Sequence, residues 1–157
     1  MRYVFMTAAC GLLGTPALAA VDLSAAQACF IAKTEPTTCI DAAQADCMAS
    51  LSEAPSAATV CFRAAQEVWS EGIGAQINVI ASQPDETLTA VARIETKYDL
   101  LTNMLQCDKI EDLSKAASDL TGEMIAAQKA ACQSTASGLS YMRLMLRSRT
   151  LPVEPAK

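Results

Sequence analysis

The stretch CIDAAQADCMASLSEAPSAATVC, which runs from Cys39 to Cys61, places three cysteines in a segment that otherwise favours helix. Alanine is its commonest residue and has the highest intrinsic helix propensity. Pro55 interrupts the segment, because proline is tolerated only in the first turn of a helix. The stretch therefore predicts a helix, a turn and a second helix. Whether its thiols bind metal, act as nucleophiles or form disulfides decides how the fold is held together.

The first residues indicate the compartment. Arg2 precedes a short apolar stretch, and small residues end at Ala19, as a signal peptidase requires. We expect residues 1–19 to be a cleaved signal peptide and the mature protein to be periplasmic or secreted. A lipid anchor at Cys10 is the alternative, but the residues before it lack the usual leucine. No later segment reaches the roughly 20 apolar residues that a membrane span needs.

The mature chain has the size of one domain. Removing 19 residues from 157 leaves 138. Apolar residues make up 52% of the sequence, but aromatic residues only 4%, so large core side chains are scarce and covalent cross-links are expected. We predict a single domain over residues 20–149 and a disordered tail over 150–157, where two prolines oppose helix.

Six cysteines remain after cleavage, an even number that predicts three disulfides in an oxidising compartment. Zinc sites use closely spaced cysteine pairs or histidines, and this chain has neither. Without histidine, Ser-His-Asp and Cys-His nucleophiles are excluded as well. We expect no metal and no cofactor. The six residues are Cys29, Cys39, Cys47, Cys61, Cys107 and Cys132.

Helix geometry narrows the fifteen ways of pairing six cysteines. If Cys39 and Cys47 share a helix, they lie about 12 Å apart along its axis. That exceeds the limit of about 7 Å between the Cα atoms of a disulfide. Antiparallel helices joined by turns before Pro36 and at Pro55 bring Cys29 level with Cys39 and Cys47 level with Cys61, and Cys107 and Cys132 remain as the third pair. The predicted pairs are Cys29–Cys39, Cys47–Cys61 and Cys107–Cys132.

Helix signals dominate the rest of the chain, and no run alternates long enough to be a strand. Ser24 and Gln27 form a candidate capping box, and Gly72 and Gly74 indicate a kink or close packing, with a hinge as the alternative. We predict an all-α, irregular bundle of about five helices cross-linked by three disulfides. The expected helices run from Ser24 to about Lys33, from Thr37 or Thr38 to Leu51, from about Ser56, from Ser82, and from about Leu113 to Arg147.

The core is predicted from apolar periodicity. Trp69, the single tryptophan, is expected to fill the core with its indole N–H on a nearby acceptor. In the fourth helix, apolar residues recur at steps of three and four, which predicts one buried face. The predicted core residues are Trp69, Ile73, Val91, Ile94, Tyr98, Leu101 and Leu105.

The charge is acidic and uneven. The formal net charge is −5, and loss of the leader with Arg2 makes it −6. This balance argues against nucleic acid and favours a cationic partner, although an acidic surface also keeps an exported protein soluble. Arg143 and Arg147 stand one turn apart, where they complement a helix C-terminus or bind an anionic ligand such as a phospholipid.

Candidate catalytic groups are few. Glu67 with Glu71, and Glu95 with Asp99, are carboxylates four residues apart, a spacing that solvated helix faces produce constantly. No accompanying motif is present, so we expect no enzyme. Four methionines could fill a core or line a groove for an apolar ligand. They are Met104, Met124, Met142 and Met145.

Cysteines and their neighbours follow a pattern between about Cys39 and Arg147. A cysteine opens a helix that bears tryptophan, a later helix ends in cysteine, and a last cysteine precedes a helix with threonine, arginine and leucine. The positions are Cys61, Trp69 and Ile73, then Cys107 and Asp108, then Cys132, Thr135, Arg143 and Leu144. This arrangement resembles the lysozyme inhibitor LprI-like family, which consists of exported helical modules. The resemblance implies a binding module and supplies no catalytic residues.

Together these features predict an exported, non-catalytic protein-binding module. A lysozyme inhibitor is the specific form, with a cationic lysozyme-type enzyme as the partner. Two alternatives are a small helical carrier of an apolar or amphipathic ligand and a structural or assembly factor of the cell envelope. Neither nucleic acid nor a membrane span is expected.

Overall fold

The computed structural model describes residues 21–32 and 35–149, and within these ranges the chain is all-α, as predicted. The predicted signal peptide and C-terminal tail lie outside the described residues. The predicted second helix is divided at Gln44, which raises the number of helices in the described part from five to six. They are α1 (Leu23–Ala32), α2 (Pro36–Ala43), α3 (Ala45–Ala49), α4 (Pro55–Ala81), α5 (Glu86–Ala117) and α6 (Gly122–Arg149).

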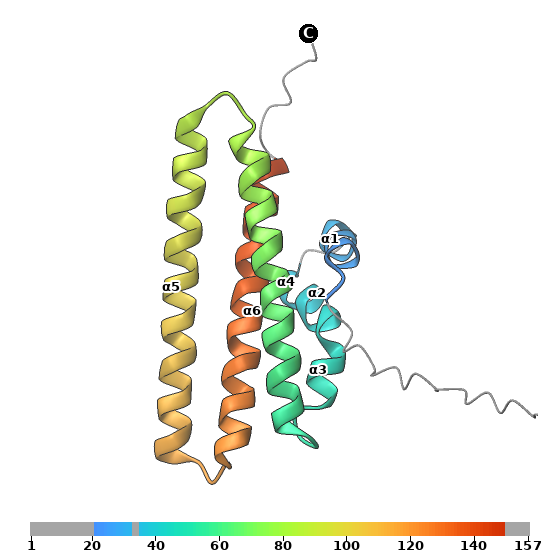
Figure 1. Ribbon diagram of the computed structural model, residues 1–157, viewed down its shortest axis with the longest axis vertical. Coiled ribbons are helices and arrows are strands. Elements are labelled where there is room, and N and C mark those ends of the chain that lie inside the picture. Colours follow the sequence, from blue (N-terminus) through green and yellow to red (C-terminus); the bar gives the residue numbers. More distant parts are fainter. Residues whose placement is uncertain (1–20, 33–34, 150–157) are drawn as a thin grey trace, which may run out of the picture.

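The three long helices run up, down and up, so that α4 and α6 are parallel and α5 is antiparallel to both (Figure 1). Helix α6 packs against α4 over most of its length and against α5 on another side. The short helices α1, α2 and α3 cover α4 and α6 on the side away from α5. One side of α5 is consequently left without a neighbouring helix among the described residues.

Side-chain caps explain where α1 and α5 begin. Asp22, and not Ser24, caps α1: its Oδ1 accepts hydrogen bonds from the amides of Ser24 at 2.9 Å and Ala25 at 3.1 Å. Gln27 donates to the Tyr141 hydroxyl instead of completing a capping box. Asp85 caps α5 by accepting from the Thr87 amide at 2.8 Å.

The last predicted helix, from about Leu113 to Arg147, is divided between the end of α5 and α6. Leu113 belongs to α5, and a break after Ala117 separates this helix from α6, which starts at Gly122. Gly138 lies inside α6. It lies directly against the fully buried Ile40, so a Cβ there would come within 3.1 Å of the isoleucine Cγ1.

The core lies between α4, α6 and the short helices. Trp69 and Ile73 are buried, as predicted, and the Trp69 ring lies 5.6 Å from that of Tyr141, centroid to centroid. The indole N–H, however, has no hydrogen-bond partner among the described residues, in contrast to the prediction. A second, smaller cluster surrounds Phe62 between α4 and α6. Helix α5 contributes Ala92 as its buried member of the main cluster.

Three disulfides cross-link these layers in the predicted pairs. Cys29–Cys39 joins α1 to α2, and Cys47–Cys61 joins α3 to α4. Cys107–Cys132 joins α5 to α6, with 5.7 Å between the two Cα atoms. Among the described residues, no helix combines the length and the apolarity that crossing a membrane would need.

Candidate functional site

The apolar face of α5 points to solvent, and its five members form what we call the α5 stripe. The prediction that these residues are core is wrong for all of them. The side chains keep between a third and two thirds of their accessible surface, a large exposure for residues of this kind. The exposed fractions are 36% for Val91, 56% for Ile94, 63% for Tyr98, 50% for Leu101 and 59% for Leu105.

The opposite face of α5 is the buried one. It presents Ala92, Thr96 and Cys107 to the neighbouring helices. Thr96 and Tyr98 point to nearly opposite sides, because two residues turn a helix by about 200°. Periodicity reveals that a helix has an apolar face but not which neighbour covers it. The small residues opposite the stripe and the cysteine that bonds α6 were the sequence signals for the true contact face.

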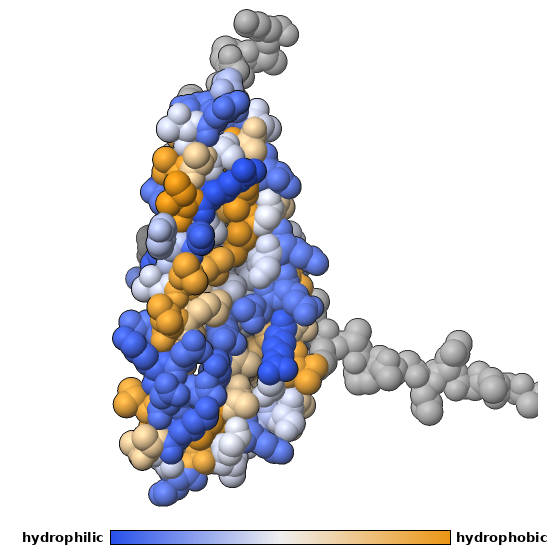
Figure 2. Space-filling view, turned by 60° about the vertical axis from the view of Figure 1, so that its left-hand side comes forward, coloured by the Kyte–Doolittle hydropathy of each residue, from blue (hydrophilic) through white to orange (hydrophobic). Residues whose placement is uncertain are grey.

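Several of the exposed large apolar residues lie together along α5, while others, such as Val60 and Val79 of α4, lie elsewhere. Figure 2, in which the α5 side comes forward, shows hydrophobic surface over the upper half of this face, crossed by hydrophilic side chains, and a more hydrophilic lower half. Single exposed apolar side chains are normal on soluble proteins, whereas contiguous patches mark interaction surfaces. The members of the stripe follow one another along one side of the helix and form a line of apolar side chains, although hydrophilic side chains cross this surface (Figure 2).

A cavity of about 500 Å³ lies beside the stripe, between α5 and α6, and we call it the α5–α6 groove. Ile94 and Tyr98 belong to both features, so the stripe borders a hollow and not a flat surface. Ser140 lines the groove, and its buried hydroxyl oxygen has no hydrogen-bond partner among the described residues. The lining residues are Ile94, Glu95, Thr96, Tyr98, Asp99, Ser140, Arg143, Leu144 and Arg147.

Two ion pairs cross the groove. Arg143 Nη1 lies 3.0 Å from Asp99 Oδ2, and Arg147 Nη2 lies 2.6 Å from Glu95 Oε2. The two carboxylates predicted to share one helix side do so, and they face the two arginines of α6. Each arginine charge is thereby neutralised by a carboxylate of the same chain. The groove consequently offers little net attraction for an external anion.

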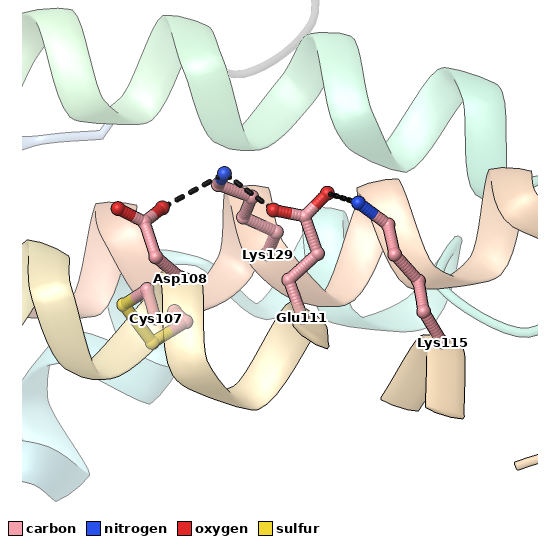
Figure 3. Close-up of polar contacts among 6 residues, drawn as sticks. Cys107, Asp108, Glu111, Lys115 and Lys129 are labelled. Atoms are coloured by element: carbon pink, nitrogen blue, oxygen red, sulfur yellow. Dashed lines mark hydrogen bonds and ion pairs between the residues drawn. A yellow bond between two sulfur atoms is a disulfide. The ribbon is translucent and has the colours of Figure 1, made fainter. Parts of the chain in front are cut away.

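Lower on the same helix pair, Lys129 of α6 joins two acidic residues of α5 (Figure 3). Its Nζ lies 2.8 Å from Asp108 Oδ1 and 2.5 Å from Glu111 Oε2. Lys115 contacts the other oxygen of Glu111 at 2.7 Å. Hydrogen bonds from Lys115 and Lys129 lower the pKa of Glu111, and those to Asp108 and Glu111 raise the pKa of Lys129. This cluster adjoins Cys107 and fixes α5 to α6.

A second cavity, of about 280 Å³, lies among α1, α2 and α3. Alanine side chains and the Cys29–Cys39 disulfide form much of its wall. Gln44 lines it, but the Oε1 atom of this residue is itself inaccessible and without a partner among the described residues. Asp22, on the rim, is engaged in capping α1, and the hydrogen bond from the Ser24 hydroxyl is the main cause of its lowered pKa.

The remaining candidate residues do not assemble into a site. Glu67 and Glu71 are exposed on α4. Met142 and Met145 are buried, while Met104 and Met124 are partly buried, and none of the four lines either cavity described above. In the described part of the chain, no group of three or more histidine, cysteine or carboxylate side chains is placed to hold a metal ion.

No protein-family model, curated protein or solved structure matches this chain. The features of the molecule that bear on function are therefore the α5 stripe, the groove beside it and the charges around them.

Proposed function

We propose that this chain is an exported, non-catalytic protein-binding module whose docking surface is the α5 stripe. The observation that carries the proposal is the exposure of five large apolar side chains in one line along α5. Covering such side chains removes apolar surface from water, which is the main driving force of protein association.

The scaffold supports this role because it holds the stripe rigidly. A disulfide on the buried side of α5 and an ion-pair cluster near its C-terminal end fix this helix to α6. A preorganised surface binds more tightly because less conformational entropy is lost on association. The three disulfides also support export, since disulfides persist mainly in oxidising compartments.

Affinity capture from an envelope extract tests the proposal. The wild-type protein is compared with Ile94→Gln/Leu101→Gln on the stripe and with Val60→Gln/Val79→Gln, which changes two similarly exposed valines of α4. We expect a stoichiometric partner that is retained by wild type and by the α4 variant and lost by the stripe variant. A partner that all three proteins retain equally would contradict the assignment of the surface.

The partner class that we propose to test first is a lysozyme-type muramidase. The resemblance described above and the net charge of −5 support a cationic enzyme as the target. Inhibition assays at low and high salt provide the test, and attraction by net charge predicts weaker association at high salt. If no muramidase is bound or inhibited, this target is wrong, while the capture experiment still tests the docking surface.

A further inference from the structure

The spacing of the α5 stripe is that of a coiled-coil seam. Its members follow one another at steps of three, four, three and four residues from Val91 to Leu105. This is the a/d pattern of a heptad repeat, with Val91, Tyr98 and Leu105 at a and with Ile94 and Leu101 at d. A second helix covers such a seam by knobs-into-holes packing. Thr87 and Asp108 occupy the seam positions on either side, so the apolar seam extends over about 21 Å, the length of a helix of about 15 residues.

The charges that flank the seam are selective. In a heptad, the e and g positions border the seam and contact the partner helix. Here Glu95 at e is paired with Arg147, and Glu111 at g is paired with Lys115 and Lys129. Lys97 at g and Lys109 at e are exposed and have no ion pair among the described residues. At the e and g positions, the charge left to contact a partner is therefore positive, although the protein as a whole is acidic and Asp112, at the next a position, is exposed.

From this geometry we infer that the partner docks an amphipathic α-helix along α5, with apolar residues on the seam and acidic residues at its flanks. This inference rests on the proposed function and specifies the chemistry of the partner at the same surface. It concerns local contacts, since salt screens exposed charges beyond about 8 Å. The net charge of the partner can have either sign.

A second copy of this chain fits the seam less well. In an antiparallel pair of α5 helices, the g positions of one helix lie opposite the g positions of the other. Between residues 90 and 104, the g positions are Ala90, Lys97 and Met104. A parallel pair aligns g with e and places Lys97 opposite Thr102. Neither arrangement places an acid opposite Lys97, whereas an acidic amphipathic helix does.

Two synthetic helical peptides test the inference. Both have 21 residues and the same leucine and isoleucine seam, with glutamate at e and g in the acidic probe and lysine there in the basic probe. Their affinity for the purified, disulfide-intact protein is measured by fluorescence anisotropy. We expect the acidic probe to bind about tenfold more tightly at low salt, with a smaller difference at high salt. Lys97→Glu/Lys109→Glu should reverse the preference, and Leu101→Asp should abolish binding of both probes.

Arg63→Glu on α4 is the matched charge control, because it changes an exposed base away from the stripe and should leave the preference intact. Equal or tighter binding of the basic probe would overturn the inferred flank chemistry. Failure of both probes, together with a partner captured through the stripe, would overturn the helix inference and leave the proposed function standing. A stable dimer in analytical ultracentrifugation that Leu101→Asp dissociates would overturn it in favour of a second copy.

Discussion

The two helices α4 and α5 are of similar length, yet different forces hold them in place. Helix α4 buries eight residues, including Phe62, Trp69 and Ile73, and so supplies much of the hydrophobic core. Helix α5 has 32 residues but buries three, of which Ala92 is small and Thr96 is polar. The third is Cys107, which is bonded to α6. Covalent and ionic contacts supplement a small apolar contact on α5, to which Ala92 and the partly buried Leu88 and Leu100 contribute.

This difference has a functional consequence. When the apolar face of a helix is buried in the core of its own chain, that face is not accessible to a partner protein. Because a disulfide and ion pairs hold α5, its large apolar side chains remain available at the surface. The comparison also predicts that substitutions on the two helices have different consequences.

Core truncation on α4 should have the largest effect. Trp69→Ala removes the largest fully buried side chain and should lower the free energy of unfolding by about 3–5 kcal/mol. Leu101→Ala on α5 removes a half-exposed side chain and should cost about 0.5 kcal/mol or less. Urea unfolding followed by circular dichroism measures both. Equal losses would show that α5 buries its stripe in solution.

Removing the disulfide between α5 and α6 should have the second-largest effect on stability. Cys107→Ala/Cys132→Ala opens a loop of 25 residues and should cost about 3 kcal/mol. Native-state hydrogen exchange should show amides of α5 exchanging faster while those of α4 remain protected. Cys29→Ala/Cys39→Ala serves as the matched control, because that bond does not involve α5. Equal acceleration of α4 and α5 in the Cys107→Ala/Cys132→Ala variant would contradict the view that the bond specifically holds α5.

Two neighbouring glycines of α4 test its packing. A Cβ on Gly72 would lie 2.9 Å from Cε2 of the buried Tyr141 ring, whereas nothing lies within 4 Å of a Cβ on Gly74. Gly74→Ala should stabilise the protein by about 0.5–1 kcal/mol through helix propensity. Gly72→Ala should destabilise it by about 1–2 kcal/mol through overpacking. Thermal unfolding compares the variants, and stabilisation by both would rule out close packing at Gly72.

The ion-pair cluster on α5 should give the smallest effect, with a defined pH dependence. The pKa of Glu111 is lowered from 4.5, so its contribution to stability is present above that pH and is lost as the pH falls through the folded-state pKa. The pKa of Lys129 is raised from 10.5, so its contribution is lost only as the pH rises beyond that value. The melting-temperature difference between wild type and Glu111→Gln should be constant from about pH 6 to 9 and shrink in acid. A difference that persists unchanged at about pH 2 would contradict the ionic contribution.

Several features of the fold could be read from the sequence because their causes are local. Proline positions and alanine content predict helices and turns, and the turns bring the paired cysteines together. The predicted helix boundaries were less accurate. Asp22, and not Ser24, caps α1, and the predicted second helix is divided at Gln44. Such choices depend on contacts that one helix does not determine.

The sequence by itself determined an all-α chain with three predictable disulfides and a periodic apolar face on α5, since propensity, turn chemistry and spacing are properties of neighbouring residues. Only the tertiary structure decided which side of α5 is buried. The Cys107–Cys132 bond lies on the same side of α5 as its small residues and turns that side toward α6. The larger apolar residues consequently face outward, because an α-helix cannot present opposite sides to the same neighbour.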